Sequence, residues 1–194
     1  MPKVCRRKKR LLEKLQSFQE FRVHQLKAAQ YEFFEHWYYT AIRELLEIVP
    51  FNEKYKEFGS LLEPSVSASE VFKAVKVLEK LGLIEKNENG YWEKTERLLS
   101  TGYEAPTKAV GSYILKTLDL AKKALGRVPR EERNISWATF SISEDSFKKI
   151  QDEIRSFRLK ILQLASQDPN PERVYHLGIN FFPFSKSRKG KERL

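Results

Sequence analysis

The run from Ser67 to Lys94 constrains the fold more than any other part of the chain. Its first four residues, Ser67 to Glu70, form a capping box: the serine hydroxyl accepts from a backbone N–H three residues on, and the glutamate bonds back. Apolar residues then recur at helical spacing up to Gly82, which stands where a helix end favours a left-handed residue. This pattern predicts a helix that begins beside Ser67 and ends beside Gly82.

Two short β-prone runs follow this helix and predict a hairpin. They are Leu83–Lys86 and Tyr91–Lys94, and the turn between them, Asn87–Gly90, has the Asn and Gly residues typical of hairpins. A shorter helix is predicted before the capped one, over Glu53–Leu62. Helix, helix and hairpin in this order are typical of a winged helix-turn-helix. We therefore expect an α+β, mainly helical chain with a winged-helix domain at 30–103.

The segment before this domain is predicted to be a basic arm with a leading helix, residues 1–29. Residues 30–49 carry apolar side chains three and four apart and predict a helix that Pro50 ends. The aromatic residues Trp37–Tyr39 are of the kind on which nucleic-acid bases stack. Because consecutive residues of a helix point in different directions, packing in the core is the favoured interpretation.

The C-terminal part is predicted to be a domain at 104–184, followed by a basic disordered tail at 185–194. Its pattern favours a helix-strand-long helix-strand unit, with helices at 106–125 and 144–167 and strands at 136–142 and 174–182. The long helix has nearly heptad apolar spacing, which is also typical of a coiled-coil dimer. Packing onto a sheet made by the two flanking strands is favoured, and dimerisation through the helix stays open.

The net charge of +10 is located mainly in the two tails. Residues 1–10 carry six Lys/Arg and no acid, residues 185–194 have a net charge of +4, and the residues between them sum to zero. Five consecutive cations can neutralise several phosphates of a nucleic acid. The arm therefore supplies the first candidate contacts with DNA, namely Arg6, Arg7, Lys8, Lys9 and Arg10.

The outer face of the capped helix supplies the second set of candidate contacts. Ser69, Lys73, Lys76 and Lys80 line one stripe, and the hairpin adds Lys86, Asn89 and Lys94. In a winged helix that binds DNA, this stripe enters the major groove. However, residues 51–103 hold eight Lys/Arg and nine Asp/Glu, and binding to phosphates needs local positive charge. The charge count favours a protein-contact role for this face, and direct reading of DNA remains the alternative.

Catalytic, metal-binding and cofactor-binding functions find no support in the sequence. The three histidines, His24, His36 and His176, are far apart and have no carboxylate or cysteine at ligand spacing. Cys5 is the only cysteine, which fits a reducing compartment and excludes an internal disulfide. No apolar run is long enough to span a membrane. We therefore expect a cytoplasmic, non-enzymatic protein without cofactor or metal.

Several runs of residues resemble a bacterial family of unknown function, expanded as a paralogous set in Fibrobacter and also seen in predatory bacteria. The resemblance covers about residues 20–186. The runs that carry it are Phe34–Leu46, Leu78–Ile84, Ser100–Gly102, Val128–Arg133, Val174–Leu177 and Phe182–Phe184. The Trp-Tyr and Phe-Pro pieces are the more specific ones, whereas Leu-Gly-Leu-Ile occurs in many winged helices.

The resemblance implies a transcriptional regulator, because members of that family are predicted to be regulators. Many of them carry a separate Cro-like helix-turn-helix domain before this region, whereas here only about twenty residues precede the match. If that domain binds the DNA, this chain is part of a longer protein or a member without that activity. The leading hypothesis is a regulator that binds DNA through the basic arm, with or without the winged helix. The alternatives are a protein-interaction or dimerisation module without nucleic-acid binding and, more weakly, single-stranded RNA binding.

Overall fold

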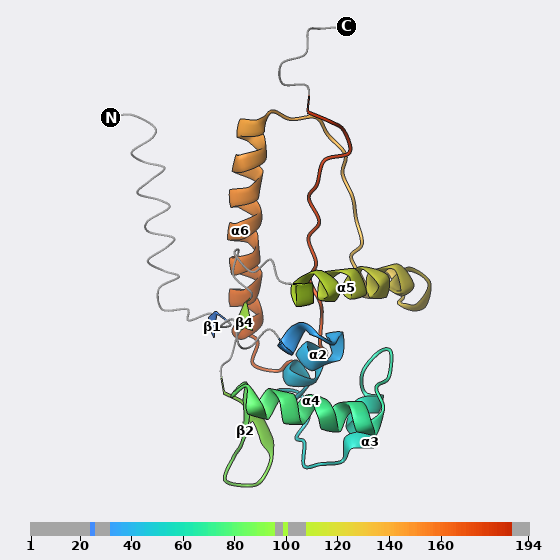
Figure 1. Cartoon of the computed structure of the whole chain (residues 1–194), viewed down its shortest axis with the longest axis vertical. Helices are drawn as coiled ribbons and strands as arrows, with labels where there is room; N and C mark the ends of the chain where they lie inside the picture. Colours follow the sequence, from blue (N-terminus) through green and yellow to red (C-terminus); the bar gives the residue numbers. More distant parts are fainter. Residues whose placement is uncertain (1–23, 26–31, 96–98, 101–107, 188–194) are drawn as a thin grey trace, which may run out of the picture.

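A computed structural model describes residues 24–25, 32–95, 99–100 and 108–187 of the chain. Figure 1 shows a cluster of short helices with one hairpin, and a long upright helix above it. The described part is mainly helical with a small antiparallel sheet, as predicted. The elements in chain order are β1 (His24–Gln25), α2 (Trp37–Leu45), α3 (Tyr55–Ser60), α4 (Ala68–Lys80), β2 (Ile84–Lys86), β3 (Trp92–Lys94), β4 (Leu99–Ser100), α5 (Lys108–Arg127), η2 (Arg130–Glu132) and α6 (Glu144–Ser166).

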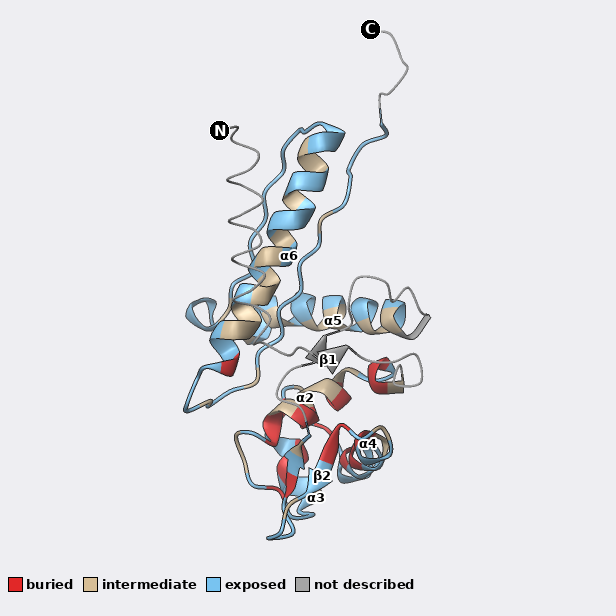
Figure 2. Ribbon diagram, turned by 90° about the vertical axis from the view of Figure 1, so that its left-hand side faces the viewer, coloured by how far each residue is buried: buried red, intermediate tan, exposed pale blue. Residues whose placement is uncertain are grey.

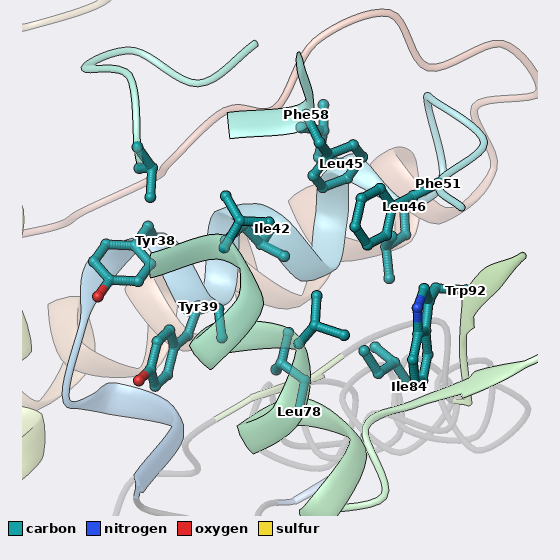
Figure 3. Packing of buried hydrophobic residues seen from close by; sticks show 14 of the residues in the cluster. Tyr38, Tyr39, Ile42, Leu45, Leu46, Phe51, Phe58, Leu78, Ile84 and Trp92 are labelled. Atoms are coloured by element: carbon teal, nitrogen blue, oxygen red, sulfur yellow. The ribbon is translucent and has the colours of Figure 1, made fainter. Parts of the chain in front are cut away.

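The hydrophobic core lies between α2, α3, α4 and the hairpin. Figure 3 shows Ile42 from α2, Phe58 from α3, Leu78 from α4 and Trp92 from β3 pointing toward one another. All of these side chains are buried, as is Phe51 in the loop between α2 and α3. The apolar faces of three short helices and one hairpin are thus buried against each other, which gives elements of this length their stability.

The hairpin forms as the sequence predicts. β2 and β3 pair antiparallel, with Ile84 opposite Lys94. Gly82 and Gly90 both adopt positive φ, at the end of α4 and in the turn, so each glycine has the conformation for which it was expected. Phe51 forms a further antiparallel bridge to Trp92, which attaches the loop after α2 to the free edge of the hairpin.

The helix predicted from residue 30 begins later than expected. α2 begins only at Trp37, because His36 is in an extended conformation and residues 32–34 form a tight 3-10 turn. The leading helix expected within 1–29 falls outside the described residues, except for β1. Those two residues pair in parallel with β4, so they form a strand and not a helix.

Both predicted helices of the C-terminal part are present. α5 contacts α2 through Tyr113, whose hydroxyl lies 3.0 Å from Thr40 Oγ1 and whose ring meets Phe34 edge-on. α6 begins where Ser143 accepts from the backbone N–H of Ser146, at 3.2 Å. The N-cap therefore fixes the start of the long helix, as the sequence suggests.

The two predicted strands of the C-terminal part do not form. Residues 136–142 and 174–182 run beside α6 and belong to no sheet (Figure 1), so the predicted strand pairing there is wrong. Alternation of apolar residues requires only an extended chain, whereas a strand also requires a partner for its backbone groups. Figure 2 shows that buried residues are concentrated in the helix-and-hairpin body, while α6 and its two neighbours are mostly exposed.

Candidate nucleic-acid interface

The candidate interface is built on α4, and the capping box fixes where this helix begins. The Ser67 hydroxyl oxygen accepts from the backbone N–H of Glu70 at 3.3 Å. In return, Glu70 Oε2 accepts from the backbone N–H of Ser67 at 3.0 Å and from its hydroxyl at 2.6 Å. These hydrogen bonds hold the pKa of the Glu70 carboxyl below its ordinary value. Glu70 is thus part of the cap and forms no ion pair with the lysines of the stripe within the described residues.

The outward stripe of α4 is exposed as predicted, but two of its three lysines are held by carboxylates. Lys76 Nζ lies 3.1 Å from Glu79, one turn along the helix. Lys80 Nζ lies 2.8 Å from Glu32, and this hydrogen bond raises the pKa of the lysine. Lys73 and Ser69 are exposed on the same stripe. The positive charge that could face a phosphate is therefore largely compensated on this face.

The hairpin shows the same compensation. Lys86 Nζ lies 2.7 Å from Glu53 Oε1 and 5.1 Å from the centre of the Trp92 ring. The hydrogen bond to Glu53 raises the pKa of Lys86 and lowers the pKa of Glu53. Asn89 is exposed in the turn, where its backbone N–H donates to Asn87 Oδ1 at 3.1 Å. The hairpin tip is thus organised by its own hydrogen bonds.

Lys94 lies inside an ion-pair cluster that joins the hairpin to α2. Its side chain is only 8% exposed; Nζ is 2.8 Å from Glu44 and also contacts Glu47. Arg43 is fully buried beside it, with Nη1 2.6 Å from Glu44 Oε1 and Nε donating to the backbone oxygen of Leu83 at 3.4 Å. The two cations are buried, whereas Glu44 and Glu47 remain partly exposed. The cluster joins the hairpin to α2, because loss of the carboxylates would leave buried cations without compensation.

Sequence reasoning missed Arg43 as a buried residue. Arg43 lies next to Ile42 and one turn after Tyr39, a position that the sequence alone assigns equally well to the exposed edge of the helix. A buried cation needs a carboxylate within reach, and Glu44 is the one that the fold supplies.

The charge of the described body is negative. Residues 32–95 contain eight Lys/Arg and twelve Asp/Glu, a net of −4. The candidate residues of the arm, Arg6–Arg10, lie outside the described residues. The structure therefore brings Ser69, Lys73, Lys76 and Lys80 together on one face, in a body whose overall charge opposes binding of a polyanion.

The described residues contain no group of His, Cys, Asp and Glu that could hold a metal ion. His36 stacks on Tyr38 at 5.0 Å between ring centres, and His176 meets Tyr113 edge-on at 6.1 Å. Burial lowers the pKa of His176, which favours its neutral form. In the same part of the chain, no helix has the length and apolar character needed to cross a membrane.

Residues 18–184 match the model of a protein family described as a domain of unknown function, DUF4423. The match covers most of the chain, and the chain belongs to this family. Comparisons with curated proteins and with solved structures gave no match.

Proposed function

We propose that this chain is a transcriptional regulator whose body, residues 32–95, is a winged helix that contacts protein. The order of elements supports a winged helix: α2, the bridging residue Phe51, α3, α4, then the hairpin β2–β3. α3 packs on α4 through Tyr55 and Phe72, whose rings meet edge-on at 5.5 Å. This packing of two consecutive helices supports their assignment as a helix-turn-helix, with the hairpin after them as the wing.

The observation that carries the protein-contact role is the compensation of the lysines on α4 and the hairpin. Lys76, Lys80 and Lys86 all lie within 3.1 Å of a carboxylate oxygen. A DNA phosphate would have to compete with these carboxylates in a body of net charge −4. Phe72, which is exposed on α4, adds apolar surface of the kind that protein partners cover.

Contact with duplex DNA belongs, in this proposal, to the basic arm. Arg6–Arg10 bring five consecutive cations, which exceed any cluster of positive charge on the body. Phosphate contacts of this kind give affinity without sequence preference and a steep dependence on salt. The arm would hold the regulator near DNA while the body contacts its protein partner.

A salt titration of duplex binding tests this division of roles. We would measure fluorescence anisotropy of a labelled duplex between about 50 and 200 mM salt, where affinity falls with a slope of about −0.9 per neutralised phosphate. The full chain is compared with two variants: Lys73→Gln, Lys76→Gln, Lys80→Gln, and a second with all five arm cations changed to Gln. We expect the arm variant to lose most of the slope and the α4 variant to keep both slope and affinity.

Two results would contradict the proposal in different ways. If the α4 variant loses affinity and the arm variant does not, α4 reads the DNA groove and the protein-contact role is wrong. If the unmodified chain does not bind duplex at about 50 mM salt, the role of the arm is wrong.

A further inference from the structure

α6 and the two extended segments beside it form a layer of apolar side chains that the rest of the described chain leaves uncovered. Trp137 is 89% exposed and Phe184 79% exposed, and in α6 only Ser166 is buried. Figure 2 shows α6 and its neighbours in the colours of exposed and intermediate residues almost throughout. The exposed members of this layer are Ile135, Trp137, Phe140, Ile142, Phe157, Leu164, Tyr175, Leu177, Ile179, Phe182 and Phe184.

Packing within the chain covers little of this layer. The ring of Phe181 lies 6.2 Å from that of Phe140, which joins the two extended segments to each other. It also lies 5.1 Å from the ring of Phe147, which joins the second segment to α6. Within 134–142 and 174–184 the chain forms no ladder in the described structure. In the described structure, the extended segments have no neighbouring strand and the helix is only half covered. This arrangement is expected of a layer that packs against a further element.

The uncovered area is large enough for a stable interface. An aromatic side chain buries about 150–250 Å² when fully covered. The exposed fractions of the eleven side chains, summed over all faces of the layer, give an apolar area on the order of 1,000 Å². A standard protein interface buries about 800 Å² on each partner. Exposed apolar patches above a few hundred Å² mark interaction sites.

The apolar stripe of α6 is complementary to itself when two helices run antiparallel. The spacing between its members alternates three, four, three, four, three, so the stripe reads the same in both directions about a point between Arg155 and Ser156. A second α6 in antiparallel orientation therefore brings apolar residue against apolar residue at every level. The stripe is made of Phe147, Ile150, Ile154, Phe157, Ile161 and Leu164.

The charges along α6 select the antiparallel orientation. Residues 144–153 contain four acids and two lysines, whereas residues 154–166 contain three Lys/Arg and no acid. Antiparallel helices place the acidic half of one beside the basic half of the other, while parallel helices place like halves together. On the heptad set by the stripe, Glu153 and Lys160 take the flanking positions that meet across an antiparallel pair.

We propose that the uncovered layer of α6 and residues 134–142 and 174–184 is a homodimer interface, in which a second copy of this chain packs with its α6 antiparallel to the first. The self-complementary stripe and the two oppositely charged halves identify the partner as a second copy. This interface lies outside the helix-and-hairpin body and does not depend on what that body binds.

Sedimentation equilibrium of the full chain tests this interface. We expect a particle of twice the 22.9 kDa chain mass at micromolar concentration. Ile154→Asp together with Phe157→Asp should give a monomer, because each change places a carboxylate in the apolar stripe. Both residues lie outside the buried cluster, so the circular dichroism of the variant should still report the folded body.

A charge swap tests the orientation. Lys160→Glu should weaken the dimer about tenfold at low salt, because each of the two symmetric contacts then sets a carboxylate against Glu153. Adding Glu153→Lys in the same chain should restore the affinity. Lys149→Glu makes the same change of charge away from the stripe and should leave the dissociation constant within about twofold.

Three results would overturn the inference. The first is a monomer up to about 100 µM, well above the dissociation constants usual for interfaces of this size. The second is a dimer that survives the double aspartate variant. The third is a charge swap that fails to restore what Lys160→Glu loses. None of these results bears on the duplex titration, so failure of the dimer and failure of the proposed function are distinguishable.

Discussion

Gly59 is the residue at which the packing of α3 leaves no room for a side chain. A Cβ built there would lie 2.1 Å from the backbone oxygen of Val66 and 2.9 Å from a methyl carbon of Val71. The backbone N–H of Val66 also donates to the Gly59 oxygen at 3.0 Å. The glycine therefore lets α3 approach the loop that leads into α4.

Gly59→Ala should destabilise the body by about 1–3 kcal/mol, because the backbone of Val66 must move to admit a methyl group. Urea denaturation followed by circular dichroism measures the change. Gly111→Ala is the matched control: it lies in α5 with nothing within 4 Å of the added carbon, and alanine is the better helix former. An equal effect of the two substitutions would show that Gly59 is not tightly packed.

The raised pKa of Tyr38 predicts how the stability of the body changes with pH. Burial raises its pKa to about 12, and the nearby Tyr39 and Glu70 add to the shift. The neutral phenol is thus favoured in the folded state, so this stability is present below pH 10 and is lost as the pH rises from 10 toward 12. The phenolate absorbance of the protein minus that of Tyr38→Phe should titrate near 12. A midpoint near 10 would contradict the burial of this ring.

At the residue scale, sequence reasoning found the glycines and missed the buried charge. The positive φ of Gly82 and Gly90 could be predicted from the sequence, because glycine adopts this conformation more readily than other residues. The burial of Arg43 could not be predicted, because a charged residue next to an apolar stripe is typical of an exposed helix edge. Its burial follows from the position of the hairpin, which brings Leu83 and Lys94 against α2. This long-range contact is not encoded in local spacing.

The capping box of α4 gives a prediction at the scale of one element. Ser67→Ala should lower the free energy of unfolding by about 1 kcal/mol, because the backbone N–H of Glu70 loses its acceptor. Ser69→Ala, two residues on in the same exposed turn, should have no effect or stabilise slightly. The two variants are compared by urea denaturation. Equal destabilisation by both would mean that the cap does not fix the start of α4.

Among the elements, helices whose start is marked by a local capping residue were predicted well, and strands that depend on a partner were not. Ser143 and Ser67 mark the starts of α6 and α4, and both helices begin there. The predicted strands at 136–142 and 174–182 had the right alternation, but no neighbour supplies their hydrogen bonds within the described chain. Pairing between segments is decided by tertiary structure, which periodicity does not report.

At the scale of the whole molecule, the folded body and the main cluster of positive charge lie in different parts of the chain. The helix-and-hairpin body was predicted from the order of its elements, and its core is now seen between α2, α3, α4 and the hairpin. The α4 lysines are exposed on one stripe as predicted, yet Lys80 pairs with the distant Glu32, and Lys86 of the hairpin pairs with the distant Glu53. Long-range ion pairs of this kind are invisible to a count of charges along the sequence.

The central claim is that the body, residues 32–95, has its own buried core, whereas the layer formed by α6 and the segments beside it leaves its apolar side chains uncovered within one chain. Hydrogen exchange of the full chain at high dilution, where a dimer dissociates, tests this claim most directly. We predict slow exchange for the amides of α4 and the hairpin and fast exchange for 136–142 and 174–182, whose amides lack ladder bonds. Equally slow exchange of those two segments in dilute solution would show a sheet closed within one chain and would contradict the account.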